Sequence, residues 1–243
     1  YVAAVLQDDA VYAYGLTADG VTGSGVHVIG GAGDATNATP DVACNDDGLC
    51  LVVWSSHSAP NDADDVRWRR LSPTLQVEGD VSAVTAPAGA QTYGGAVAAG
   101  DENFMAVWAV GDAISRTLVA GSINAYGTVS SPTLTLDSGL IGQADVAYAF
   151  DRYHVVWERD GDLYAAEIYG AQVTTATVAA SAAVEAEPRI AYDALGQRSL
   201  IAYRHATGDA SPSLHVRVFA GGHAGASVAL VQTGARDASM SPA

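Results

Sequence analysis

The sequence predicts an all-β fold, and three observations support this prediction. Short apolar runs recur along the whole chain, and residues typical of turns, such as glycine, asparagine and aspartate, separate them. No segment shows the 3.6-residue periodicity of a helix. The 243 residues are 49% hydrophobic and 16% charged, which provides enough apolar material for a packed core and excludes a disordered acidic chain.

A repeated unit organises the chain. Its most visible part is a four-residue apolar run that ends in an aromatic residue or, in the first copy, in a valine. The five copies lie at 2–5, 51–54, 105–108, 154–157 and 200–203. Their last residues, at positions 5, 54, 108, 157 and 203, are 49, 54, 49 and 46 residues apart. A period of this length is typical of repeat architectures.

Three further strands are expected around each copy. A short strand with the pattern x-Val/Ile-Ala precedes the complete copies, at 41–43, 96–98, 145–147 and 189–191. A third strand has apolar residues five positions apart, at 11 and 16, 66 and 71, 118 and 123, 163 and 168, and 214 and 219. A weaker fourth strand follows at 25–29, 81–85, 133–136, 174–179 and 227–231. Four short strands per repeat are typical of a β-propeller blade, and the continuously apolar second strand fits a sheet covered on both faces.

The predicted architecture is therefore a single domain over 1–243, a five-bladed β-propeller with four antiparallel strands per blade. The complete blades span 40–86, 95–137, 144–180 and 188–232. The first blade is split: 1–30 lack the innermost strand, and the C-terminus at 241–243, which resembles the start of such a strand, closes the ring and protects the sheet edge. A β-sandwich is the alternative, but a sandwich does not require one four-strand unit at a nearly constant period.

The two cysteines are expected to form a disulfide across a hairpin. Cys44 and Cys50 are separated by Asn-Asp-Asp-Gly-Leu, in which the first four residues are typical of a turn. Two reduced thiols in a cytosolic protein are the alternative. A disulfide implies an extracellular or cell-surface location, or the periplasm.

The blade motif combines a proline or small residue, x-Val-Ala, a turn, Val-Val-Trp and a third strand with five-residue spacing. It resembles the tandem repeats of secreted and lipoprotein β-propellers of high-GC bacteria, in particular myxobacteria. The Cys-x5-Cys hairpin is also similar to that group. The resemblance covers essentially the whole chain and implies the fold and an extracellular location, but no reaction. The Trp-Asp blade ending, the sialidase box and the Asp-rich calcium motif of integrin-like blades are all missing from the sequence.

The candidate ligand-binding residues come from one end of the predicted ring. In a propeller, the loops from the second to the third strand share a face with the loops that enter each blade, and the former are long in the second, third and fifth repeats. Residues at the start of the inner strands are expected to line the channel, where they bind a ligand or pair with one another. The full set is Asp41, Asp145, Glu187 and Arg189, together with His57, Tyr93 and His205 from the same face. Trp68 also departs from the repeat and is expected either to contact a partner or to cover the outer sheet.

The acidic residues allow two alternative kinds of site, a hydrolase site and a calcium site. Asp41, Asp145 and Glu187 could serve as the three inward carboxylates of a five-bladed glycoside hydrolase, although no local motif surrounds them. Asp62, Asp64 and Asp65 in the long loop of the second repeat supply oxygen ligands at close spacing, as calcium requires. A solvated surface turn is the other interpretation of that loop, and no other cofactor is expected.

Charge restricts the partners. Eleven basic residues, all arginine, against 27 acidic residues give a net charge of −16, so nucleic acid and anionic membrane surfaces are not expected to bind. No apolar stretch approaches the roughly 20 residues of a membrane-spanning helix. The sequence therefore favours a non-catalytic extracellular module that binds a glycan or a protein. The alternatives are a structural subunit of a surface assembly, in which copies of the chain associate, and the hydrolase.

Overall fold

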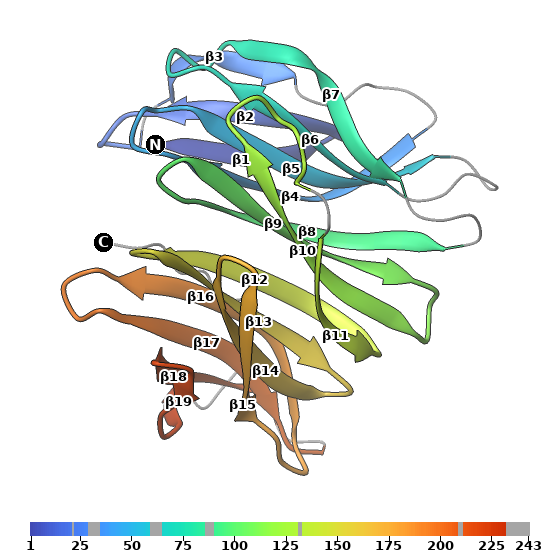
Figure 1. Ribbon diagram of the computed structural model, residues 1–243, viewed down its shortest axis with the longest axis vertical. Coiled ribbons are helices and arrows are strands. Elements are labelled where there is room, and N and C mark those ends of the chain that lie inside the picture. Colours follow the sequence, from blue (N-terminus) through green and yellow to red (C-terminus); the bar gives the residue numbers. More distant parts are fainter. Residues whose placement is uncertain are drawn as a thin grey trace. The chain divides into compact units, whose positions relative to one another are not determined.

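The computed structural model describes residues 1–20, 22–28, 35–58, 65–85, 90–130, 133–208 and 211–231. Within these ranges the chain forms strands and no helix (Figure 1). No helix that could span a membrane is therefore found there.

The strands form five sheets in the described part of the chain. The first sheet contains β1 (Val2–Gln7), β2 (Ala10–Leu16) and β3 (Thr22–Val28). The second contains β4 (Ala35–Cys44), β5 (Cys50–Ser58), β6 (Asp65–Leu71) and β7 (Val77–Thr85). The third contains β8 (Gln91–Ala99), β9 (Asn103–Gly111), β10 (Arg116–Asn124) and β11 (Leu134–Gly139). The fourth contains β12 (Ile141–Ala149), β13 (Arg152–Arg159), β14 (Asp162–Tyr169) and β15 (Gln172–Ala179). The fifth contains β16 (Val184–Asp193), β17 (Arg198–Ala206), β18 (Ser213–Ala220), β19 (His223–Ala224) and β20 (Val228–Val231).

The repeated four-strand unit is confirmed. In the second, third and fourth sheets, four consecutive strands pair in chain order. In the last sheet, β20 pairs with β18 at the position predicted for the fourth strand, and the short β19, which the sequence did not predict, pairs with β18 as well. The first sheet has three strands among the described residues, and its predicted closure by 241–243 lies outside them. Five blades in a closed ring therefore stay a prediction, as does a single domain over 1–243.

The chain divides into two compact units. Unit 1 comprises Tyr1–Asp112 and Val119–Thr133, and unit 2 comprises Ala113–Leu118 and Leu134–Ala243. Unit 1 thus holds the first two sheets with β8 and β9, and unit 2 holds the last two sheets with β11.

Both faces of the sheets carry the core. Successive residues of a strand point to opposite faces, yet Val155, Val156 and Trp157 of β13 are each at most 1% exposed. In unit 1, alternate residues of β5 belong to two different clusters: Val53 packs with Trp108 and its neighbours, and Val52 packs with Val11 of β2. The continuous apolar runs of β5, β9 and β13 therefore reflect sheets that are covered on both sides.

Aspartates at the inner strands join neighbouring sheets. Within unit 1, Asp41 Oδ1 accepts a hydrogen bond from the N–H of Val42 at 2.9 Å, and Oδ2 accepts one from the N–H of Val97 in the next sheet at 2.8 Å. Within unit 2, Asp145 repeats this arrangement with the N–H groups of Val146 at 3.0 Å and of Ile190 at 2.8 Å. At the equivalent position β8 has an alanine, which offers no carboxylate.

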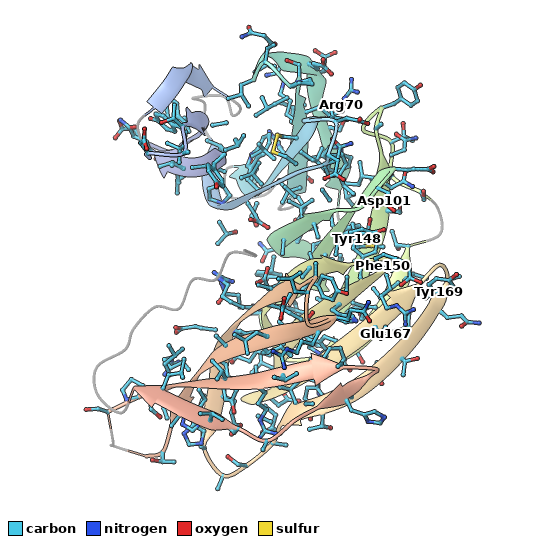
Figure 2. All side chains as sticks on the ribbon, turned by 90° about the vertical axis from the view of Figure 1, so that its left-hand side faces the viewer. Arg70, Asp101, Tyr148, Phe150, Glu167 and Tyr169 are labelled. Carbon is cyan, nitrogen blue, oxygen red and sulfur yellow. A yellow bond between two sulfur atoms is a disulfide. The ribbon has the colours of Figure 1, made fainter. Side chains whose placement is uncertain are left out.

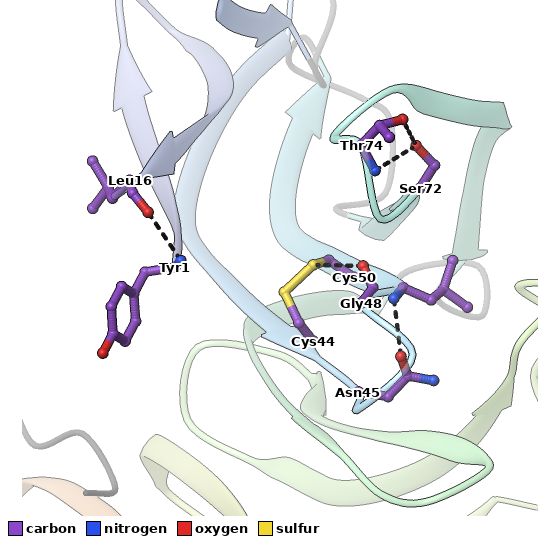
Figure 3. The surroundings of a disulfide bond; sticks show 9 residues. Tyr1, Leu16, Cys44, Asn45, Gly48, Cys50, Ser72 and Thr74 are labelled. Atoms are coloured by element: carbon purple, nitrogen blue, oxygen red, sulfur yellow. Dashed lines mark hydrogen bonds between the residues drawn. A yellow bond between two sulfur atoms is a disulfide. The ribbon is translucent and has the colours of Figure 1, made fainter. Parts of the chain in front are cut away.

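The predicted disulfide is confirmed. Cys44 and Cys50 are bonded and face each other directly across the β4–β5 hairpin, with a Cα–Cα distance of 4.0 Å (Figure 3). Asn45 closes the turn by accepting a hydrogen bond from the N–H of Leu49 through its side-chain oxygen at 2.9 Å. Gly48 adopts a φ of 78°, a conformation that most side chains disfavour.

We expect the disulfide to stabilise the fold. In the chain-entropy description, opening a loop of this size lowers the free energy of unfolding by about 2 kcal/mol, so the Cys44→Ser, Cys50→Ser double variant should unfold at a lower urea concentration. Dithiothreitol should shift the parent protein to the same midpoint and leave the variant unchanged. Thiol alkylation of the native protein without reductant, followed by mass measurement, should find no adduct, and two adducts would contradict the prediction.

We also expect Asp145→Ala to destabilise unit 2. The substitution leaves two N–H groups without their carboxylate acceptor at a junction between sheets, which costs about 2 kcal/mol or more in the free energy of unfolding. Asp193→Ala is the control, because this exposed aspartate contacts only Leu195 and Arg198 of its own surface turn among the contacts described, so its loss should change stability by less than about 0.5 kcal/mol. Equal denaturation curves for the two variants would refute the role given to Asp145.

Candidate functional site

A cluster of polar residues lies at one end of unit 2, where β16 begins and β13 and β17 end. We call it the polar end. Its members are Glu158, Glu185, Glu187, Arg204, His205 and His215. The register of the β16–β17 pair shifts between Ala186 and Arg189, and Glu187 within this bulge has a φ of 55°. Bulges of this kind redirect side chains, and here Glu185 is buried whereas Glu187 is exposed.

Glu185 is the buried carboxylate of the polar end. It is 2% exposed, and its Oε1 accepts a hydrogen bond from the Ser181 hydroxyl at 2.6 Å. The same oxygen lies 3.8 Å from Nε2 of His205, its cross-strand partner. The second oxygen, Oε2, is buried without a hydrogen-bond partner among the described residues. A buried carboxylate oxygen without a hydrogen bond lowers the stability of the fold unless a donor group reaches it.

Two stacked histidines extend the cluster. The rings of His205 and His215 lie 4.4 Å apart at an interplanar angle of 22°. The nitrogens of His215 are within hydrogen-bond distance of two hydroxyls, Ser227 at 2.9 Å and Ser213 at 3.0 Å. Burial lowers the pKa of His215, and the neighbouring charges of His205 and Arg217 act in the same direction. The ring of His215 is therefore neutral and fixed in orientation at neutral pH.

An ion pair and a second carboxylate complete the polar end. Arg204 Nε donates to Glu187 Oε1 at 3.0 Å, with the two side chains 29% and 46% exposed. Glu158 accepts a hydrogen bond from the N–H of Glu187, but burial is the larger influence and raises the pKa of Glu158. The Arg204 charge opposes this shift. The polar end thus holds a carboxyl group that protonates more readily than usual beside one that is paired with arginine.

Arg189 and Asp145 lie next to this cluster on the inner strands. With its amide oxygen turned toward Arg189, Gln143 accepts from both terminal guanidinium nitrogens at 2.9 and 2.8 Å. This contact determines the orientation of the amide, because oxygen and not nitrogen must face two donors. The carboxylate of Asp145 joins two inner strands, as described above. Four of the sequence-predicted residues, Asp145, Glu187, Arg189 and His205, therefore belong to unit 2, and their role in binding stays a prediction.

The remaining predicted residues belong to unit 1 or lie outside the described residues. Asp41 joins β4 to β8, and Tyr93 donates its hydroxyl to Gln91 Oε1 at 2.7 Å. Asp65 lies 3.5 Å from the Arg67 guanidinium. Asp62 and Asp64 of the predicted calcium loop, and the side chain of His57, are outside the described residues, so the calcium site stays a prediction. Trp68 is 4% exposed and donates to Gly127 O at 3.0 Å, so it is a core residue of unit 1 and not a free contact.

Sequence reasoning did not find Glu158, Glu185, Arg204 or His215. None belongs to a motif, and each joins the cluster through strand register: Glu185 pairs with His205 only because the bulge in β16 sets that register. The pattern Glu-Ala-Glu-Pro at the start of the last inner strand, with a proline next to two acids, was the available indication of a bulge.

A second polar cluster lies within the core, at the other end of β13. Nδ1 of His154 is 2.8 Å from the Ser199 hydroxyl, and Nε2 is 3.3 Å from Glu167 Oε2. The order serine, histidine, carboxylate resembles a hydrolytic triad. Ser199, however, is 0% exposed and His154 is 4% exposed, so no substrate reaches the hydroxyl in this structure. The three residues act as a polar cross-link between β13 and β17.

Comparisons with known proteins define the class of this fold. No family model and no curated protein matches the sequence. Among solved structures, the chain is similar to TolB from Acinetobacter baumannii, with a TM-score of 0.55, 14% identity, and coverage of 96% of this chain and 53% of that one. A thermostable family-43 glycoside hydrolase has a TM-score of 0.52, 8% identity, and coverage of 98% and 94%. The fucose-specific lectin of Aleuria aurantia has a TM-score of 0.50, 10% identity, and coverage of 91% and 74%.

These likenesses show the fold alone. The chain is an all-β protein made of propeller-like four-stranded antiparallel sheets, and its structural neighbours include a propeller lectin and a propeller hydrolase. It spans about half the length of the TolB structure that it matches.

Stability should fall when the pH is lowered through the titration range of histidine. Burial lowers the pKa of His154, although Glu167 opposes this, and the pKa of His215 is lowered as well. The unfolded chain binds protons near pH 6.5, whereas the folded chain does so only at lower pH. The stabilisation is therefore complete above about pH 6.5 and is lost as the pH falls below it.

The measurement is a series of urea denaturation curves between about pH 7.5 and 5.5. His154→Gln should have a smaller dependence of unfolding free energy on pH than the parent protein. His223→Gln is the control, since His223 is exposed and its removal takes nothing from the core. A slope for His154→Gln equal to that of the parent would rule out His154 as the source.

Proposed function

We propose that this chain is a non-catalytic extracellular binding module that recognises a glycan through the polar end of unit 2. The observation that carries the proposal is the half-exposed Arg204–Glu187 ion pair at the bulge of β16, next to the carboxyl group of Glu158. Sugar hydroxyls donate and accept hydrogen bonds at once. An arginine and a carboxylate that hold each other in a fixed orientation match that requirement.

The scaffold and the location support this function. We propose that the sheets form a five-bladed ring whose first blade is completed by the C-terminus, so that the loops at one face surround a channel. Asp62, Asp64 and Asp65 would supply oxygen ligands for calcium at that face. The disulfide is consistent with a secreted or periplasmic protein. The lectin neighbour is described as fucose-specific, which makes a glycan the favoured ligand class over a protein.

The net charge of the protein indicates which class of glycan it binds. With a charge of −16 and no lysine, the protein repels polyanions except where an arginine is locally uncompensated. At the polar end, the charge of Arg204 is compensated by Glu187. A neutral glycan is therefore favoured over an acidic one.

Glycoside hydrolysis is the second candidate, and Glu158 is the observation in its favour. A general acid needs a raised pKa, and burial raises the pKa of Glu158, which lies next to Glu187. One structural neighbour, a thermostable family-43 glycoside hydrolase, is matched over 94% of its own length. Against this, Glu187 is exposed and paired with Arg204, and Glu185 is buried.

A glycan array followed by titration of the best ligand tests the proposal. Arg204→Ala should weaken binding at least tenfold, because the variant loses both the donor and the partner that orients Glu187; tenfold corresponds to about 1.4 kcal/mol. Arg198→Ala is the matched control, since Arg198 forms an exposed ion pair with Asp193 at 3.5 Å at the other end of β16 and β17, and it should bind as the parent does.

Two outcomes would contradict the proposal. One is undiminished binding by Arg204→Ala. The other is turnover of chromogenic glycosides that disappears in Glu158→Gln, which would establish the hydrolase instead.

A further inference from the structure

The turn between β12 and β13 places an aromatic side chain in a strained position. The N–H of Asp151 donates to Ala149 O at 2.9 Å, which encloses Phe150 alone in a three-residue γ-turn. Phe150 has a φ of 67°, so the turn is of the rarer and more strained of the two γ-turn forms. At the β4–β5 hairpin the residue of positive φ is a glycine, Gly48. A bulky residue is disfavoured at such a φ, yet Phe150 is also 77% exposed and gains little from burial.

Further aromatic residues accompany Phe150. We call the set the aromatic end of unit 2: Tyr148, Phe150, Tyr153 and Tyr169. Tyr148 and Tyr153 are cross-strand partners below the turn, with ring centroids 5.0 Å apart. Tyr169 ends β14 and is 55% exposed. Figure 2 shows Tyr148, Phe150 and Tyr169 along the same edge of the unit, with Glu167 beside them.

A frame of charged groups connects the aromatic end to the core. Arg152 donates through Nε to Asp151 Oδ1 at 2.6 Å and through Nη1 to Glu167 Oε1 at 2.8 Å. Its guanidinium lies 5.6 Å from the ring centre of Tyr169. Glu167 is braced in turn by His154, which contacts the buried Ser199 hydroxyl. The cross-link inside the core therefore fixes Glu167 and Arg152 at the surface, next to two exposed rings.

Backbone strain without compensating burial is typical of functional positions, because it persists only where the surrounding structure or selection for function maintains it. We propose that the aromatic end is a second ligand site, which binds a neutral glycan. The C–H face of a sugar ring stacks on Phe150 and Tyr169, and its hydroxyls bond to Arg152 and Glu167.

The charge of this end selects a neutral ligand. Arg152 is already paired with two carboxylates, and its side chain remains 36% exposed. An anionic ligand would meet Asp151 and Glu167 at short range, which disfavours it. A sugar takes donors and acceptors together and needs no net charge, as this arrangement of one guanidinium, two carboxylates and aromatic faces provides.

Position distinguishes this site from the polar end. Arg152 begins β13 and Glu158 lies near its other end, so six residues of extended chain, about 20 Å, separate them. One glycan chain bound at each end would give the module two attachments, and two weak contacts on one scaffold combine into a tighter one.

Native gel electrophoresis in gels that contain xylan, arabinan, mixed-linkage β-glucan or galactomannan tests the site, since all four are neutral soluble polysaccharides. At least one should retard the parent protein. Phe150→Gly should weaken that retardation at least tenfold and should melt at a temperature no lower than the parent, because glycine relieves the strain. Tyr169→Ala should also weaken it. Tyr126→Ala is the control, since this 83% exposed tyrosine belongs to unit 1.

The results separate this site from the polar end. Retardation that Phe150→Gly abolishes and Arg204→Ala leaves in part supports the aromatic site, whether or not the polar end binds. The proposal is overturned if none of the four polysaccharides retards the parent, if Phe150→Gly behaves as the parent does, or if Tyr126→Ala loses as much as Phe150→Gly.

Discussion

The packing of one sheet face against the next is the interaction on which the rest of the structure depends. The second strands β5, β9 and β13 are apolar and buried on both faces, and each would leave one of these faces in water without a neighbouring sheet to cover it. Polar groups within such a junction must find partners there. Asp41 and Asp145 accept hydrogen bonds from N–H groups of neighbouring inner strands. Deeper in unit 2, His154 and the Ser199 hydroxyl form a hydrogen bond with each other.

This constraint places the chemistry at the ends of the strands. The middle of each sheet is occupied by core residues, so exposed polar or aromatic groups gather where strands begin and end. In unit 2 the two ends differ in character. One combines a bulge, a buried carboxylate and stacked histidines, and the other combines a strained turn, exposed rings and a paired arginine. Both are fixed by contacts that originate in the core.

The balance between binding and hydrolysis rests on a small number of groups. Glu158 has the raised pKa of a general acid, but Glu187 is held by Arg204, and the serine beside His154 is sealed in the core. In the proposed binding function, the polar groups at the end of the sheet orient a ligand.

The sequence by itself determined the repeat, the all-β class, the strand positions and the disulfide, because these depend on local pattern and a fixed period. It indicated Glu187, Arg189 and His205, but not Glu185, Glu158, His215 or Phe150. Strand register and bulges decided those positions. A one-residue shift moves a side chain to the other face of a sheet, and only the packing of neighbouring sheets determines where such a shift occurs. The tertiary structure therefore decided which carboxylates are buried, which are paired, and which aromatic ring faces solvent.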